Sequence, residues 1–287
     1  MIPLKIIYTL QELAEWRQSL KNQPVTLGFV PTMGALHHGH ISLINRALEE
    51  CDVVIASIFV NPTQFNDPHD FLHYPKNNAA DLEMLKDYPS VVVFMPSTAE
   101  MYPSIEKEVF NAGLLTSTLE AKLRPGHFDG VITIIRKLFD AVEAHKVYFG
   151  EKDFQQLAVI KAWVAKEARK EIIDPCPTIR EKDGLAMSSR NLRLSAEQRA
   201  LAPLIFQTLQ EVQLQMAYQN PAELEVWARS VLHNHPAFKL DYFEIIDGNS
   251  FAPLAEWQDS TLPVALLAAF MGDVRLIDNL PLTAQSI

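Results

Sequence analysis

The sequence predicts an α/β fold, in which a Rossmann-like, doubly wound parallel sheet is followed by a smaller C-terminal α+β domain. Strand-like and helix-like segments alternate up to about residue 180, which is typical of parallel βαβ units with helices on both faces of a sheet. The run from Val53 to Val60 is almost continuously apolar, as expected for a strand covered on both sides. After Ser195 the order changes to helices followed by strands, which indicates a separate unit. We therefore expect two domains, 1–185 and 186–287.

Each element is predicted from a local pattern. Short apolar runs predict strands at 25–30, 52–60, 91–95, 146–149 and 171–174. Apolar residues at helical spacing predict helices at 10–20, 39–50, 77–87, 129–143 and 153–168. In the second part, Ser195 is the expected N-cap of a long helix that runs to about Tyr218, and Pro221 suits the first turn of another helix. Strands are expected there at 240–246 and 262–271.

The composition is that of a folded protein from a reducing compartment. The chain has 287 residues, of which 48% are hydrophobic and 21% charged, so it can build a full core. Cys51 and Cys176 lie beside apolar runs without a paired spacing, so we expect buried thiols rather than a disulfide or a metal pair. The N-terminus lacks the apolar core and cleavage site of a signal peptide, and the longest apolar run, 262–271, is too short to span a bilayer. We therefore expect a soluble, cytoplasmic protein.

The most informative motif is PTMGALHHGH, residues 31–40, between a predicted strand and a predicted helix. His37 and His40 lie three residues apart, which places them on one face at the mouth of that helix. A helix start also presents unpaired backbone N–H groups and the positive end of the macrodipole. Together these features predict a receptor for the polyphosphate of a nucleotide. The histidine pair could instead supply two metal ligands, but no cysteine or acidic cluster nearby completes a set. From the pattern alone His38 has no role, and we expect it to be exposed.

Two further segments carry cations and hydroxyl groups suited to phosphate. Gly150 to Asp153 follows a predicted strand, and Lys152 supplies a compact cation, although such a turn can also be an ordinary solvated loop. Met187 to Asn191 contains two serines and an arginine, which can bind a triphosphate through charge-assisted hydrogen bonds. An ordinary interdomain linker is the alternative for this second segment, and loops at domain junctions are also natural lids.

Neutral polar groups in two other segments suit an organic substrate. Asn61 and Gln64 follow a buried strand and can recognise hydroxyl and carboxylate groups, although a turn around Pro62 would also explain them. The adjacent residues Gln155 and Gln156 point in different directions on a helix, so at most one faces a site.

Arg124 and His127 precede an apolar helix, and phosphate contact, substrate contact and loop packing all remain open for them.

Charge and missing motifs exclude several classes of function. The net charge of −10 argues against a nucleic-acid backbone as partner. Residues 1–194 carry 21 Lys and Arg against 24 Asp and Glu, and residues 195–287 carry 4 against 11. An anionic substrate therefore finds its cations in the first part. The chain has neither a P-loop motif nor a Gly-x-Gly-x-x-Gly turn after a strand, which argues against a P-loop kinase and a nicotinamide enzyme. It also has no Gly-x-Ser-x-Gly nucleophile elbow.

With these segments in view, the chain closely resembles the pantothenate synthetase (pantoate–β-alanine ligase) family, nucleotidyltransferases with a His-x-Gly-His signature. The matching segments occur in the family's order: PTMGALHHGH (31–40), FVNPTQF (59–65), RPGHFDGV (124–131), YFGEKDFQQL (148–157) and IREKDGLAMSSRN (179–191). RLIDN (275–279) extends the match toward the C-terminus. Because five segments match in order, the resemblance is highly specific.

The resemblance implies ATP-dependent condensation of (R)-pantoate with β-alanine, giving pantothenate, AMP and pyrophosphate. His40 matches the catalytic proton donor, and His37, Lys152 and Arg190 complete the expected catalytic set. Gln64 would contact pantoate and β-alanine and Gln156 pantoate, with Asn61 beside them. Domain 1–185 would bind ATP and pantoate, and domain 186–287 would act as a lid. The implied ATP-binding residues are Met33, Gly34, Ala35, Leu36, His37, His38, Gly39, His40, Gly150, Glu151, Lys152, Asp153, Ile179, Met187, Ser188, Ser189 and Arg190.

Forming an amide from a carboxylate requires activation of the carboxylate, because hydroxide is a poor leaving group and AMP is a good one. We therefore expect a pantoyl-adenylate intermediate and no covalent enzyme intermediate. Mg²⁺ would accompany ATP, its ligands are not predicted, and the resemblance implies a homodimer. Two alternatives remain open: another nucleotidyltransferase that leaves the nucleotide on its product, and a non-catalytic nucleotide-binding regulator. AMP release and β-alanine-dependent pyrophosphate release distinguish them.

Overall fold

The computed structural model describes residues 4–21, 23–104 and 108–283 and divides the chain into two compact units. Unit 1 comprises residues 1–112, 120–151 and 155–177, and unit 2 comprises 113–119, 152–154 and 178–287. The N-terminal stretch, for which the sequence predicts no signal peptide, begins with residues 1–3, which lie outside the described residues. The domain boundary that the sequence predicts near residue 185 stays a prediction.

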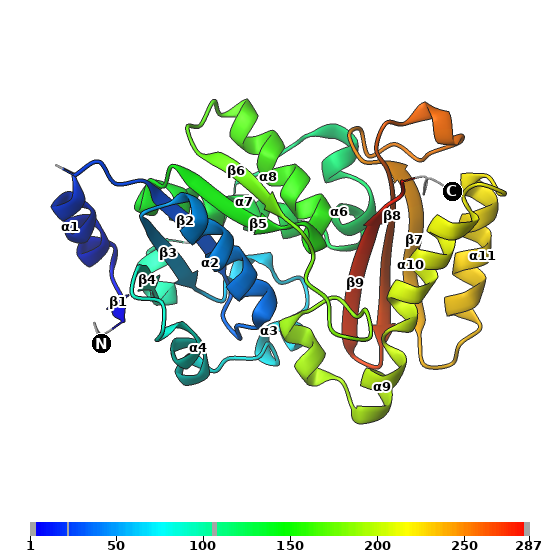
Figure 1. Cartoon of the computed structure of the whole chain (residues 1–287), viewed down its shortest axis with the longest axis horizontal. Helices are drawn as coiled ribbons and strands as arrows, with labels where there is room; N and C mark the ends of the chain where they lie inside the picture. Colours follow the sequence, from blue (N-terminus) through cyan, green and yellow to red (C-terminus); the bar gives the residue numbers. More distant parts are fainter. Residues whose placement is uncertain (1–3, 22, 105–107, 284–287) are drawn as a thin grey trace. The chain divides into compact units, whose positions relative to one another are not determined.

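Unit 1 is built on a sheet whose described strands are all parallel, in the order β1-β4-β3-β2-β5-β6 (Figure 1). Its strands are β1 (Lys5–Ile7), β2 (Leu27–Thr32), β3 (Val53–Ile58), β4 (Val91–Phe94), β5 (Lys146–Gly150) and β6 (Ile172–Cys176). Its helices are α1 (Leu10–Leu20), α2 (His38–Glu50), α3 (Pro68–Leu72), α4 (Asn78–Leu85), α5 (Thr98–Met101), α6 (Leu119–Leu123), α7 (His127–Val142) and α8 (Phe154–Lys166).

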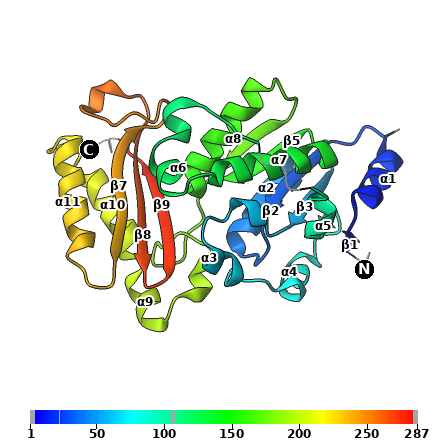
Figure 2. The same ribbon diagram turned by 180° about the vertical axis from the view of Figure 1, so that it is seen from behind.

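Helices cover both faces of this sheet. Val30 of β2 belongs to an apolar cluster with Leu43 and Ile44 of α2, which lies over the face seen in Figure 1. The neighbouring Phe29 points to the opposite face, where its ring meets Phe139 of α7 at a centroid distance of 6.4 Å. Helix α7 lies over that face of the sheet (Figure 2). The doubly wound parallel sheet predicted from the sequence is therefore confirmed.

Unit 2 contains an antiparallel sheet in the order β7-β8-β9, as part of the smaller α+β unit that the sequence predicts. Its described strands are β7 (Lys239–Asp247), β8 (Pro263–Met271) and β9 (Val274–Pro281), and its main helices are α9 (Ala196–Leu201), α10 (Leu204–Gln215) and α11 (Pro221–His233). One buried cluster joins α10 and α11 to the sheet, including Leu209, Leu224 and Leu267.

Most predicted ranges differ from the observed ones by a few residues at their ends. Ser195 and Pro221 start helices as expected, with Ser195 in a capping box. The long helix predicted from Ser195 to about Tyr218 is wrong, because Ala202 and Pro203 separate α9 from α10. Proline interrupts a helix because it has no N–H to donate and its ring clashes with the preceding turn. The sequence analysis also missed the short strand β1 and the strand β9.

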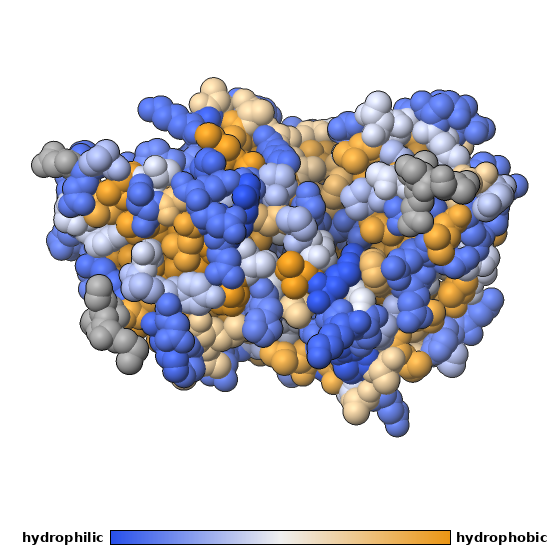
Figure 3. Space-filling model, in the orientation of Figure 1, coloured by the Kyte–Doolittle hydropathy of each residue, from blue (hydrophilic) through white to orange (hydrophobic). Residues whose placement is uncertain are grey.

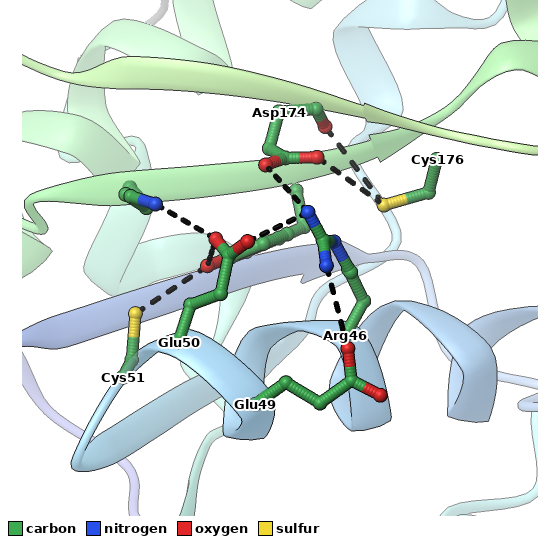
Figure 4. A network of polar contacts seen from close by, with 8 residues as sticks. Arg46, Glu49, Glu50, Cys51, Asp174 and Cys176 are labelled. Carbon is green, nitrogen blue, oxygen red and sulfur yellow. Dashed lines mark hydrogen bonds and ion pairs between the residues drawn. The ribbon is translucent and has the colours of Figure 1, made fainter.

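An ion-pair network anchors the C-terminal half of α2 to β5 and β6 (Figure 4). The Glu50 carboxylate accepts hydrogen bonds from Lys146 Nζ at 2.7 Å and from the Tyr148 hydroxyl at 3.0 Å. Arg46 pairs with Glu50 at 2.6 Å and approaches Asp174 of β6 at 3.9 Å. This helix carries the histidine motif at its other end, so the network fixes the helix that positions the motif.

Both cysteines are buried free thiols, as predicted: Cys51 contacts the Tyr148 hydroxyl at 3.4 Å, and Cys176 lies near Asp174. On the face shown in Figure 3, apolar side chains are interspersed with polar ones. Across residues 4–21, 23–104 and 108–283, no helix has the length and apolarity needed to cross a membrane.

Candidate active site

The histidine motif forms the junction between β2 and α2. His37 is the N-cap of α2 rather than a residue of its first turn, and its Nδ1 accepts the Gly39 N–H at 3.1 Å. His40 lies inside the helix, and its Nδ1 accepts the His37 N–H at 3.2 Å, so the two side chains form a reciprocal capping box. Their rings are 4.0 Å apart, centroid to centroid. Since each Nδ1 accepts a hydrogen bond, a neutral ring carries its donor proton on Nε2. His38 is exposed, as predicted.

A buried carboxylate that sequence analysis missed holds the turn before the histidines. Asp81 of α4, 2% exposed, accepts the backbone N–H groups of Ala35 at 3.0 Å and Leu36 at 2.7 Å. Gly34 and Ala35 have positive φ angles of 77° and 48°, and for alanine that conformation costs energy. Burial raises the pKa of the Asp81 carboxyl, and the two backbone hydrogen bonds act in the opposite direction. The available signal was its place one helical turn before the buried Leu85.

Asn61 and Gln64 form a second constellation in unit 1. Asn61 is 1% exposed, and its amide donates to Gln64 Oε1 at 3.0 Å and to the Gly130 carbonyl at 3.1 Å. Its own oxygen accepts the Tyr102 hydroxyl at 2.6 Å. Gln64 Nε2 donates to Met33 Sδ at 2.8 Å, which brings this segment next to the histidine turn. Asn61 therefore orients Gln64, the side chain predicted to bind substrate.

Arg124 and His127 converge on the backbone of Gln64. His127 Nδ1 lies 2.7 Å from the Gln64 carbonyl oxygen, and Arg124 donates to the same oxygen at 3.5 Å. Arg124 also pairs with the buried Glu120 at 3.3 Å. Of the uses left open for these two residues, the observed contacts are those of loop packing around Gln64.

The two adjacent glutamines of α8 behave differently, as their spacing predicts. Gln155 is 2% exposed and accepts the Glu120 N–H at 3.0 Å, so its carbonyl serves the structure of unit 1. Gln156 is only partly buried. This difference leaves Gln156 as the member of the pair suited to a ligand.

The remaining predicted ATP residues are divided between the units. Gly150 ends β5 and Glu151 begins the 3₁₀ helix Glu151–Asp153, and both belong to unit 1. Lys152, Asp153, Ile179 and 187–190 belong to unit 2. In unit 2, Ser188 caps a 3₁₀ helix (Ser189–Arg193) by accepting the Arg190 N–H at 3.3 Å. The Met187 N–H donates to the Ile179 carbonyl at 2.9 Å, so these two predicted residues are held side by side.

The donor set of the described residues does not form a metal cage. In the part of the chain that the structure describes, no three His, Cys, Asp or Glu side chains are grouped so that they could hold a metal ion. The observed contacts of the His-x-x-His pair are those of a helix cap.

Comparison with known proteins decides the family. The family model for pantoate-beta-alanine ligase matches residues 5–281. The chain belongs to this family. Pantothenate synthetase of Porphyromonas gingivalis W83 is 46% identical over 277 residues, which cover 96% of this chain and 99% of that protein. Pantothenate synthetase of Bacteroides thetaiotaomicron is 44% identical, covering 96% and 98%.

Solved structures of family members share the whole fold. Pantothenate synthetase from Thermus thermophilus superimposes with a TM-score of 0.90 at 37% identity, covering 97% of this chain and 99% of that one. The pantoate-beta-alanine ligase from Francisella tularensis, complexed with beta-gamma ATP and beta-alanine, gives 0.81 at 37% identity and covers 97% of both chains. The resemblance inferred from the motifs is confirmed, and this pantoate–β-alanine ligase uses ATP to join pantoate to β-alanine.

Proposed function

We propose that the ligation proceeds through a pantoyl adenylate and that the predicted motif residues carry it out. A carboxylate oxygen of pantoate attacks the α-phosphorus of ATP, and the bond from that phosphorus to the pyrophosphate oxygen breaks. The neutral amine of β-alanine then attacks the activated carbonyl, the carbon–oxygen bond to AMP breaks, and the amine loses a proton. Neither step needs a covalent bond to the enzyme, so catalysis rests on positioning and charge stabilisation.

The observation that carries this proposal is the histidine pair at the start of α2. With both Nδ1 atoms engaged by backbone N–H groups, Nε2 is the proton-bearing nitrogen of each neutral ring. The helix N-terminus adds backbone donors and the positive end of the dipole. His40, supported by His37, would donate a proton or hydrogen bond as charge moves onto the pyrophosphate oxygens.

The other predicted residues divide into triphosphate and substrate groups. ATP would be bound by the other residues of 33–40, by Gly150 to Asp153, and by Ile179, Met187, Ser188, Ser189 and Arg190. Of these, Lys152 and Arg190 would offset the phosphate charge. Gln64, supported by Asn61, would contact pantoate and β-alanine, and Gln156 would contact pantoate. Unit 2 would act as a lid, since an adenylate hydrolyses when it is exposed to water.

Magnesium, dimer formation and location complete the proposal. Mg²⁺ bound with a nucleotide keeps water and phosphate oxygens as ligands and needs only one or two carboxylates, so it does not require a protein cage. It enters here as the counterion of the triphosphate, and neither step above depends on it.

The family resemblance supports a homodimer, and the two free thiols support a cytoplasmic location. Sedimentation of the purified protein measures its oligomeric state.

His40→Ala tests the proposed role of the histidine pair. We expect single-turnover pyrophosphate release to slow by ~10²–10³-fold, the usual loss for one transition-state donor. His73→Ala is the matched control, because His73 and His69 are exposed and stack at the same centroid distance of 4.0 Å on and beside α3. Near-normal pyrophosphate release by His40→Ala would remove His40 from the mechanism.

Substrate omission tests the reaction order. With ATP and pantoate alone, one turnover of pyrophosphate should appear while AMP stays bound in the adenylate, and β-alanine should then release AMP. For the substrate group, Gln64→Ala should weaken pantoate more than ATP in calorimetry. The reverse order of losses would contradict the assignment of Gln64.

A further inference from the structure

The RLIDN segment, residues 275–279, matched the family but has no role in the mechanism above. It lies in β9, which pairs only with β8 among the described strands and therefore forms an edge of the unit 2 sheet. Asp278 and Asn279 are consecutive residues of this strand, yet both are almost fully buried, at 3% and 4% exposed. Side chains of successive strand residues point to opposite faces, so each meets different surroundings. Their partners are the loops that carry predicted ATP residues.

Asn279 holds the backbone at Lys152. Its Nδ2 donates to the Lys152 carbonyl oxygen at 2.8 Å, across 127 residues of sequence. Residues 152–154 belong to unit 2 although residues on both sides of them belong to unit 1. Phe154 also meets Phe251 of unit 2, with ring centroids 5.7 Å apart. The Asn279 bond thus fixes the Cα from which the Lys152 side chain extends.

Asp278 holds the hairpin that joins Ile179 to Met187, through Arg180. The two Asp278 carboxylate oxygens accept from the two terminal nitrogens of Arg180 at 2.6 and 2.9 Å, a bidentate pair. Arg180 also donates to the carbonyls of Gly184 at 3.1 Å and Asn279 at 3.2 Å.

A cation–π contact and a β-bridge complete the support of this hairpin. The Arg180 guanidinium lies 3.6 Å from the centroid of the Phe206 ring. A β-bridge between Arg180 and Ala186 closes the hairpin next to Met187. A guanidinium with this many fixed partners has one position, so the hairpin that leads into 187–190 has one position as well.

We propose that Asp278 and Asn279 are positioning residues for ATP, which set two phosphate-binding segments of unit 2 from one strand edge. This proposal rests on the function proposed above, in which Lys152 and 187–190 bind the triphosphate. Neither residue touches the reacting atoms. Asn279 acts through the Lys152 backbone, and Asp278 acts through Arg180.

The test measures binding of a non-hydrolysable ATP analogue by calorimetry, and steady-state KM values for the three substrates. Asn279→Ala should weaken the analogue and raise KM for ATP by about tenfold, because one buried hydrogen bond is lost, while KM for pantoate and β-alanine stays unchanged. Asn279→Leu, which fills the volume without a donor, should give the same result and replaces the alanine variant if that variant does not fold. Unchanged affinity for the analogue would overturn the proposal.

Asp241→Asn is the matched structural control. It weakens a partly buried ion pair of Asp241 with Arg275 at 2.8 Å in the same sheet, and it touches no ATP segment. It should lower the thermal midpoint without changing KM for ATP. If Asn279→Ala and Asp241→Asn instead change all three KM values alike, Asn279 is only structural and the proposal fails.

A double-variant cycle separates this proposal from the function on which it rests. Because Asn279 acts through Lys152, adding Asn279→Ala to Lys152→Ala should weaken the analogue by less than about twofold more. If the two losses multiply, Asn279 does not act through Lys152. If Lys152→Ala alone leaves binding unchanged, the fault lies in the phosphate role assigned to Lys152, and Asn279 then has nothing to position.

Discussion

Gly130→Ala tests how closely α7 supports the substrate segment at Gln64. A Cβ atom at residue 130 would lie 2.2 Å from the Thr63 carbonyl oxygen, 2.5 Å from its carbon and 2.8 Å from the Gln64 nitrogen. All three neighbours are backbone atoms, so no side chain can rotate away. Asn61 also bonds the Gly130 carbonyl, which ties the turn to this point of the helix. The added methyl group must therefore push the turn itself.

Two opposing effects set the expected size. Alanine favours a helix over glycine by about 1 kcal/mol, whereas overpacking of a tight contact costs about 1–3 kcal/mol. The net change is a loss of about 0–2 kcal/mol in the free energy of unfolding. Carbon and oxygen atoms need about 3.3 Å, so the turn must move by about 1 Å. A displacement of that size at a site can cost ~10²-fold in rate, so kcat/KM for pantoate should fall by about that factor.

The assay is coupled AMP production with pantoate varied and the other substrates saturating, together with urea unfolding. Gly150→Ala is a stability control, because its Cβ would meet no atom within 4 Å and its φ lies outside the positive range. It should change the free energy of unfolding by less than about 1 kcal/mol, the span of strand preferences. A Gly130→Ala variant with normal kcat/KM for pantoate and unchanged or raised stability would refute the argument, since the turn would then be free to yield.

Three further predictions follow from buried or bonded groups. In Asp81→Asn an NH₂ group replaces one of the two carboxylate oxygens that accept the Ala35 and Leu36 N–H groups, so a donor then faces a donor. The free energy of unfolding measured in urea should fall by about 1–3 kcal/mol, and KM for ATP should rise. Hydrogen bonds from Ser250 and Ser260 lower the pKa of Asp247 from its ordinary value of 3.8 to about 2. The ionised Asp247 therefore contributes its full stability above pH 3.8, and this contribution is lost as the pH falls toward 2. In Asp247→Asn the free energy of unfolding should consequently fall less steeply with acidification. Burial raises the pKa of the Cys176 thiol to about 12, and Cys51 is also buried, so at a pH of about 8 a thiol reagent should label neither in the native protein and both after unfolding.

The sequence predicted most of the fold because apolar periodicity is strongest in the elements that build the core. The strands of the parallel sheet, such as β3 and β4, are buried along nearly their whole length, which leaves a continuous apolar signal. The misses have physical reasons. Strand β1 has only three residues. The polar residues Arg275, Asp278 and Asn279 interrupt the apolar pattern of β9, and the last two are buried because they bond neighbouring loops.

The sequence marks the motif residues, whose roles in binding and catalysis stay predictions, but it does not mark the residues that support them. His37, His40 and Gln64 are marked by residue type and by their place after a strand. His37 and His40 were expected on one face at the mouth of the helix; His37 is its N-cap, His40 lies in its first turn, and the ring centroids are 4.0 Å apart. Asp81 lies 46 residues from the turn it holds, so no local spacing could connect them.

Motif residues can be recognised in the sequence and supporting residues cannot, because the two kinds of residue have different tasks. A ligand-binding group must be exposed to its ligand at a strand end or a helix start, and those positions have local signatures. A supporting group only has to complete the hydrogen bonds of a buried backbone, and any part of the chain that packs there can supply it. Asp81, Gly130 and Asn279 each meet this need from a different element, under a different motif segment. Replacing a support should therefore change the affinity for one substrate while the chemistry of the motif residues stays intact, which is the pattern that the variants above measure.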